Sequence, residues 1–193
     1  GTDSGGGNVA YHTVAVGSQT GSPLQDDVIL DGFIITGGRA GVTPNAPLTD
    51  GNLLDGNDGY HTARGGGLFI WGATPSIRNC TFYDNRAYAA GGAIAIERIN
   101  GTATGNATIY NCLFYDNGVT GTNPDPSVVP NWLGAGAIFI DKAAPEITNC
   151  TITNNDGGNG VGGGVFYFDS SAAITNTIIW GNSAAGGSRS EEN

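Results

Sequence analysis

The residues best suited to metal chemistry lie in one short stretch. Residues 50–59 alternate carboxylates and amides with Gly, and such oxygens are the ligands that Ca²⁺ prefers. The stretch lacks the spacing and the closing Glu of a helix–loop–helix calcium site. An ordinary polar loop and a Ca²⁺ site both fit this composition, and Ca²⁺ is the only cofactor that the sequence leaves open. The candidate ligands are Asp50, Asn52, Asp55, Asn57 and Asp58.

Acid–base and nucleophilic chemistry have weaker candidates. Asp26 and Asp27 form a carboxylate pair without the other residues of a catalytic centre, and His12 and His61 are isolated. The three Cys residues recur in equivalent positions of a repeat with no His in register, which predicts free thiols packed as small apolar side chains. We therefore expect no catalytic residues and no enzymatic activity.

The elements that position these residues follow from that repeat. A seven-residue motif that begins and ends with Asn occurs in four copies, and each copy is preceded by a Gly-rich apolar segment. Units this short leave no room for a crossover helix, so the strands of successive units should stack in parallel, about 4.8 Å apart. A degenerate earlier copy places Asp31 at the first Asn position and Gly37 at the second. The four copies are Asn79–Asn85, Asn111–Asn117, Asn149–Asn155 and Asn176–Asn182.

Two motifs of the repeat resemble a known family. The segment Gly91–Ile94 and the Phe-x-x-Asn segments at Phe82 and Phe114 are similar to the paired motifs of polymorphic outer-membrane proteins and autotransporter passengers. Leu30–Gly38 resembles the entry coil of such domains. The resemblance covers residues 28–185 and implies an all-β fold, a right-handed parallel β-helix (solenoid) of about five to six coils with long inserted loops. It also implies a bacterial surface protein.

The chain is expected to form a single β-helix domain over residues 1–193. Residues 1–27 would be an N-terminal strand and entry segment, 28–185 the coils and 186–193 a polar tail. Long insertions are predicted near 38–64, 98–106 and 118–133, where binding functions commonly lie. Because the chain begins at Gly1 and contains no Met, we read it as a piece of a longer precursor.

Several rows of the repeat are predicted to be structural and internal. Asn tolerates the left-handed conformation that a sharp bend needs, and stacked amides can hydrogen-bond from coil to coil. The predicted Asn ladders are Asn79, Asn111, Asn149 and Asn176, and Asn85, Asn117, Asn155 and Asn182. The predicted inward rows are Cys80, Cys112 and Cys150 with Thr177; Ile77, Ile109, Ile147 and Ile174; and Phe82, Phe114, Ile152 and Ile179.

One row is predicted to point outward and to remain free for a partner. Tyr83, Tyr115 and Trp180, with Thr153 between them, should form an exposed stripe that could bind sugar rings or a partner protein. The alternative is packing between strands that only stabilises the sheet. The face of a second row stays open from periodicity alone: Phe69, Ala95, Phe139 and Phe166.

Charge and composition narrow the classes of partner. The chain has 7 Lys and Arg against 17 Asp and Glu, a net charge of −10 that disfavours nucleic acid and anionic lipid. No apolar run is long enough to insert into a membrane. Asn100 and Asn106 are the better of the candidate glycosylation sites, because the other two, Asn79 and Asn149, are expected at bends.

These features predict a non-enzymatic extracellular shaft on a bacterial cell surface, either adhesive or a fibre subunit that stacks end to end. Its partners would be further copies of itself or other surface proteins. The alternative is a glycan-binding module that uses the aromatic stripe. A polysaccharide lyase or hydrolase is the third reading, because such enzymes share the helix; Ile178 follows Asn176-Thr177 where polygalacturonases have Asp.

Overall fold

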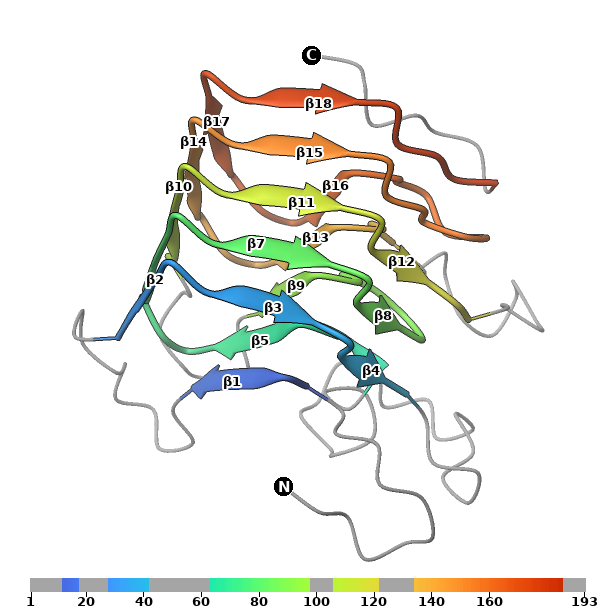
Figure 1. Ribbon diagram of the computed structural model, residues 1–193, viewed down its shortest axis with the longest axis horizontal. Helices are drawn as coiled ribbons and strands as arrows, with labels where there is room; N and C mark the ends of the chain where they lie inside the picture. Colours follow the sequence, from blue (N-terminus) through green and yellow to red (C-terminus); the bar gives the residue numbers. More distant parts are fainter. Residues whose placement is uncertain (1–11, 18–27, 42–62, 98–105, 122–133, 186–193) are drawn as a thin grey trace, which may run out of the picture.

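The computed structural model describes residues 12–17, 28–41, 63–97, 106–121 and 134–185. In these residues the chain winds into successive coils, and each coil places its strands directly above those of the coil before it (Figure 1). Along the stack the colours run from blue β3 to red β18. The strands of one coil are too short to bury a face alone, so their stability depends on stacking.

Four parallel sheets run along the stack. The first sheet contains β1 (Val14–Gly17), β5 (Leu68–Trp71), β9 (Ile94–Glu97), β13 (Ile138–Asp141) and β16 (Val165–Phe168). The second contains β2 (Ile29–Asp31), β6 (Ser76–Arg78), β10 (Thr108–Tyr110), β14 (Glu146–Thr148) and β17 (Ala173–Thr175). The third contains β3 (Ile34–Thr36), β7 (Thr81–Tyr83), β11 (Leu113–Tyr115), β15 (Thr151–Thr153) and β18 (Ile178–Trp180). The fourth contains β4 (Arg39–Ala40), β8 (Arg86–Ala87) and β12 (Gly118–Val119).

The predicted all-β parallel β-helix is confirmed. Each of the first three sheets has five strands, so the described residues form five coils, which begin at β1, β5, β9, β13 and β16. Every strand pair is parallel, and equivalent repeat positions lie opposite one another, as at Ile109 with Ile77 and Ile147. Bridges from Gly118 to Asp156 and from Asp156 to Ser183 continue the fourth sheet.

The predicted register of the first coil is wrong by one residue. Asp31 pairs with Arg78, and Ile35 pairs with Phe82. Gly32 therefore occupies the position of Asn79, and Gly38, rather than Gly37, that of Asn85. Gly32 and Gly38 have no side chain that would mark these positions as Asn does in the other copies. The sequence pattern alone could therefore not distinguish this alignment from the predicted one with Asp31 and Gly37.

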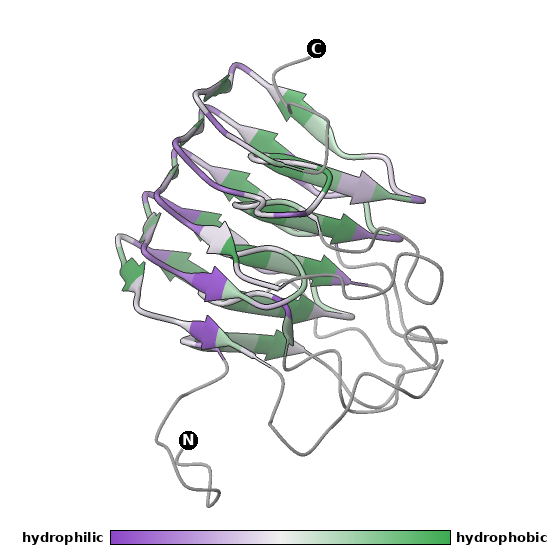
Figure 2. Ribbon diagram, turned by 90° about the vertical axis from the view of Figure 1, so that its right-hand side faces the viewer, coloured by the Kyte–Doolittle hydropathy of each residue, from purple (hydrophilic) through white to green (hydrophobic). Residues whose placement is uncertain are grey.

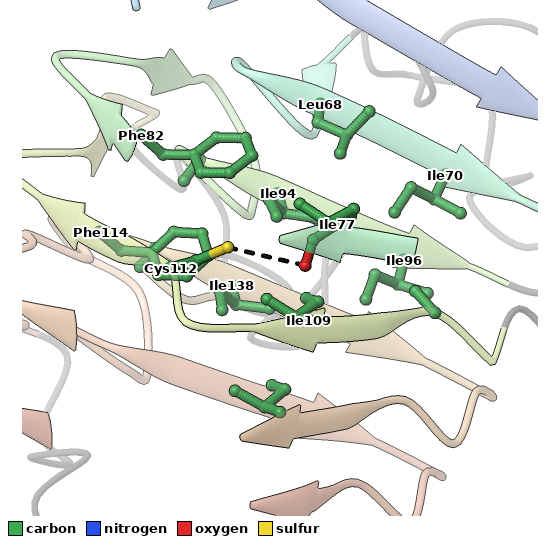
Figure 3. Packing of buried hydrophobic residues seen from close by; sticks show 14 of the residues in the cluster. Leu68, Ile70, Ile77, Phe82, Ile94, Ile96, Ile109, Cys112, Phe114 and Ile138 are labelled. Atoms are coloured by element: carbon green, nitrogen blue, oxygen red, sulfur yellow. Dashed lines mark hydrogen bonds between the residues drawn. The ribbon is translucent and has the colours of Figure 1, made fainter. Parts of the chain in front are cut away.

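The core fills the interior of the coil with large side chains in register. The inward residues of the first three sheets point toward one another, and nine of them are labelled in Figure 3 together with Cys112 from the corner between β10 and β11. Phe82 and Phe114 stack with ring centroids 4.9 Å apart. Figure 2 shows the same organisation as green, hydrophobic strand segments repeated from coil to coil. In the last coil the inward position Ile174 is 38% exposed, whereas Ile147 below it is fully buried.

The Gly-rich segments are required by the close approach of successive coils. A Cβ atom added to Gly92 would lie 2.3 Å from the carbonyl oxygen of Gly136 and 2.5 Å from the amide nitrogen of Gly118. These neighbours are backbone atoms that cannot move aside without breaking the stack. The glycine thus allows the corner before β9 to pack against the fourth sheet.

The outer face of the first sheet is covered by a second apolar layer. Phe69, Ala95 and Phe139 are in register and point away from the main core, yet all three are buried, with Phe166 half-buried beside them. They pack against Ala90 and Ala135 from the segments that precede β9 and β13. Periodicity alone did not decide which face this row occupies. In the structure the row lies on the outer face of the first sheet, and the side chains of Phe69, Ala95 and Phe139 are nevertheless buried.

The second predicted Asn ladder forms a buried inner column. Asn85 Nδ2 donates to Asn117 Oδ1 (3.0 Å), and the same bond joins each coil to the next as far as Asn182. Each amide also donates to a backbone carbonyl, and its Oδ1 accepts a backbone N–H of the preceding coil, as at Asn117 with Asn85 N. In this column the left-handed φ belongs to the preceding residue: Asp84, Asp116, Asn154 and Gly181.

The first predicted Asn ladder is an outer column, not an internal one. Asn79, Asn111 and Asn176 are exposed and Asn149 is half-buried, and all four have φ between 48° and 55°. Asn111 Nδ2 donates to Asn79 Oδ1 at 2.7 Å, and Asn79 Nδ2 donates to Asp31 Oδ1 at 2.7 Å. Hydrogen bonds from Asn79 and Arg78 lower the pKa of the exposed Asp31 carboxyl.

The three cysteines are free and buried. The Cys112 sulfur accepts the backbone N–H of Cys80 at 3.4 Å, and the thiol lies 3.7 Å from the carbonyl oxygen of Ile77 (Figure 3). A hydrogen bond with Cys150 and burial both raise the pKa of Cys112. The thiol is therefore held in its neutral form, which suits packing and not nucleophilic chemistry.

Candidate functional site

The candidate site is the outer face of the third sheet. Its five strands place two residues each on this face, forming two parallel rows along the stack. The row that ends each strand carries the predicted stripe, in register without a break. We call it the aromatic row: Thr36, Tyr83, Tyr115, Thr153 and Trp180.

Tyr83 and Tyr115 form a stacked pair within the aromatic row. Their ring centroids are 5.2 Å apart and their planes differ by 8°. Both side chains are half-buried, which is less exposed than a free platform would be. Because the rings face one another along the stack, they present their edges and hydroxyl groups to solvent, and one face of each ring is already occupied.

Trp180 is the most exposed aromatic residue of the row, at 70%. The neighbouring outward row begins with Ile34 and ends with Ile178, which are 68% and 63% exposed. Large apolar side chains so exposed on one flat sheet are typical of an interaction surface. They were not predicted from the sequence, because the alternation of a three-residue strand has too few positions to be read as a pattern.

Polar groups lie beside the aromatic row at the adjoining corner. Asp116 follows Tyr115 and Asn154 follows Thr153, and both are exposed. Nearby, Asp84 forms an ion pair with Arg39 at 3.1 Å. This face thus combines flat apolar side chains with a carboxylate and an amide, the mixture with which proteins bind polar ring compounds.

Most of the other predicted sites lie outside the described residues. These include the whole candidate Ca²⁺ cluster, Asp50, Asn52, Asp55, Asn57 and Asp58, and also Asn100, His61, Asp26 and Asp27. Asn106 is described and exposed, and its Oδ1 accepts the backbone N–H of Ala144 at 3.3 Å. The described residues contain no group of three or more His, Cys, Asp or Glu side chains that could hold a metal ion. His12 packs on Phe69 with ring centroids 5.2 Å apart.

The structure reveals a buried acidic pair that was not predicted. Glu97 and Asp141 end neighbouring strands β9 and β13 and face each other in register, and both are buried. Arg64 donates to Glu97 Oε1 at 2.8 Å, and its guanidinium lies 5.0 Å from the centroid of the Phe139 ring. Within the described part of the chain, Asp141 Oδ1 has no hydrogen-bond partner. Burial, and secondarily the charge of Glu97, raise the pKa of Asp141.

A shallow groove of about 680 Å³ lies at the corner between the first and second sheets of the last two coils. Tyr167 and Phe168 line it with Lys142, Asp169 and two serines. Tyr167 occupies an inward register position opposite Ile140, yet it is 57% exposed. The groove is therefore open because the last described coil has no described strand above it.

Comparison with known proteins identifies the family of the chain. No helix in the described residues has both the length and the apolar character required to cross a membrane. No curated protein and no solved structure matches the sequence. A family model described as the right-handed β-helix region matches residues 26–190, which includes every described strand from β2 to β18. The chain therefore belongs to the right-handed β-helix family.

Proposed function

We propose that this protein is a non-enzymatic β-helix shaft of the cell exterior that binds carbohydrate through the outer face of its third sheet. The observation that carries the proposal is the aromatic row, in which Trp180 is 70% exposed and lies in register with the stacked Tyr83 and Tyr115. Aromatic rings supply a large contact area at low entropic cost, and a rigid sheet holds them in fixed positions.

The charge of the chain favours a neutral ligand. With a net charge of −10, the molecule repels uronic acids and other anions at low ionic strength. Asp116 and Asn154 beside the row offer acceptors and donors for hydroxyl groups. Neutral hexose polymers therefore fit the face better than acidic ones.

The non-enzymatic part of the proposal is supported by the burial of the acidic pair. Glu97 is buried and paired with Arg64, and Asp141 beside it is buried as well, so neither is presented to a polymeric substrate. Release of reducing or unsaturated sugar from pectin, alginate or a neutral glucan would contradict this part.

The binding part is tested on a glycan array with the purified chain. We expect retention of a neutral oligosaccharide that falls at least about tenfold, equivalent to about 1.4 kcal/mol, when Tyr115→Ala and Trp180→Ala are combined. Tyr110→Ala is the matched control, since Tyr110 is an exposed aromatic residue on the second sheet. Equal binding by the double variant and the wild type would exclude the aromatic row.

End-to-end association is the second candidate function. Core positions of the last coil are exposed, with Tyr167 at 57% and Ile174 at 38%, and no described strand pairs with the outer edges of β16, β17 and β18. Open parallel edges of this kind can pair with another chain. Electron microscopy should show filaments that Ile174→Lys prevents; dispersed single particles at every concentration would refute association.

A further inference from the structure

The aromatic row is interrupted at one position. Tyr83 and Tyr115 stack across one coil, and Trp180 lies two coils beyond Tyr115, but the coil between them carries Thr153. Threonine has no ring to continue the stack. Each coil advances by about 4.8 Å, so the backbones that carry Tyr115 and Trp180 are separated by about 9.6 Å along the axis.

This separation matches the space that one inserted ring needs. A ring halfway between the two positions would lie about 4.8 Å from each, within the range of about 4.5–7 Å in which ring centroids stack. The neighbouring pair in the same row already shows this spacing, at 5.2 Å between Tyr83 and Tyr115. A ligand ring above Thr153 would thus continue an existing stack.

We propose that Tyr115, Thr153 and Trp180 form a subsite that takes a single neutral pyranose ring between the two aromatic side chains. This inference rests on the proposed carbohydrate-binding function and specifies where on the face it occurs. Tyr83 then acts through Tyr115, whose other ring face it supports, and does not contact the sugar.

The chemistry beside Thr153 favours a pyranose over a purely apolar ring. Asp116 and Asn154 are exposed at the corner that follows the row, within the same two coils as Tyr115 and Thr153. A carboxylate and an amide can accept and donate hydrogen bonds to the equatorial hydroxyl groups of a sugar whose faces meet aromatic rings. The negative charge of Asp116 disfavours a uronic acid at the same place.

The test fills the interruption with a protein ring. Thr153→Tyr should occupy the subsite and reduce binding of neutral hexose oligosaccharides about tenfold or more, because loss of two ring contacts is equivalent to about a 10- to 100-fold change. Thr36→Tyr is the matched control: it adds the same side chain to the same row at the far side of Tyr83 and should leave binding within about twofold. Thr153→Ala, which removes the hydroxyl and leaves the space, should also retain binding.

Titration calorimetry with neutral and uronic oligosaccharides of equal length supplies the readout, and circular dichroism verifies folding of each variant. Undiminished binding by Thr153→Tyr would overturn the subsite. If, in that case, Trp180→Ala still abolished binding, the proposed carbohydrate-binding function would stand without the subsite. Absence of binding by the wild-type chain to every neutral oligosaccharide would overturn both.

Discussion

Asp141 is a buried carboxyl in unfavourable surroundings. Its carboxyl is buried beside Glu97, whose charge disfavours ionisation as that of Asp169 does, while the charges of Lys142 and Arg64 favour it. Its Oδ1 finds no partner within the described ranges. Burial raises the pKa of this carboxyl above the usual range, so the folded state favours the protonated form.

This raised pKa predicts how stability depends on pH. Between the ordinary carboxyl pKa and the raised pKa of Asp141, the folded state binds more protons than the unfolded state, so the free energy of unfolding falls as pH rises through this window. The contribution of Asp141 to the free energy of unfolding is fully present only when the pH is below the ordinary carboxyl pKa. Asp141→Asn should remove this dependence and raise the free energy of unfolding at neutral pH by about 1–3 kcal/mol.

Urea unfolding of the two proteins at several pH values measures this difference. Exposed Asp169→Asn is the control and should change the free energy of unfolding by less than about 0.5 kcal/mol. A difference between Asp141→Asn and the wild type that shrinks as pH rises would contradict the predicted sign.

The acidic pair also shows why single residues were harder to predict than rows. Arg64, Glu97 and Asp141 come from three different coils and meet only because the strands align. Glu97 and Asp141 both end a Gly-rich strand segment, and this shared position was the only available signal. Burial of the Phe69 row was likewise not predicted, because periodicity does not show that Ala90 and Ala135 pack against the outer face of the first sheet.

At the scale of elements, each of the two Asn columns stabilises a different corner of the coil. The inner column is buried and each amide both donates to and accepts from the backbone of the preceding coil, whereas the outer column meets solvent. The repeat predicted both columns, because residues at the same position of every copy must lie at the same corner of every coil. It did not predict which column is buried, since Asn favours both a left-handed bend and a buried ladder.

The two columns should differ in their contribution to stability. Asn117→Ala removes the acceptor of the Asn85 backbone N–H and the donor to the Phe82 carbonyl, leaving buried groups unpaired at a cost of about 2–5 kcal/mol. Asn111→Gly keeps the left-handed bend of the exposed column and should cost less than about 1 kcal/mol. Thermal unfolding followed by circular dichroism compares them; equal losses would show that burial of the column is unimportant.

At the scale of the molecule, stability should depend on the position of a residue along the stack. Interior coils have a neighbour on both sides, while the last described coil has one, and Ile174 is accordingly 38% exposed where Ile147 is fully buried. In a repeat array, each contact is made only with adjacent repeats.

The same substitution in these two coils measures this effect. Ile147→Ala should lower the free energy of unfolding by about 2–5 kcal/mol, as expected for a fully buried isoleucine. Ile174→Ala, in register with it, should cost less than half as much, because part of its surface is already in water. Guanidinium unfolding of the monomer measures both; a larger loss at Ile174 would indicate that the last coil is covered in solution.

The amide-to-amide hydrogen bonds of the two columns run in opposite directions along the stack. In the amide-to-amide bonds, inner amides donate toward later coils, as Asn85 does to Asn117, while outer amides donate toward earlier ones, as Asn111 does to Asn79. Asp31 fixes the outer direction, because a carboxylate can only accept. A coil added to the stack would therefore extend the inner chain of amide hydrogen bonds as a new acceptor and the outer chain as a new donor.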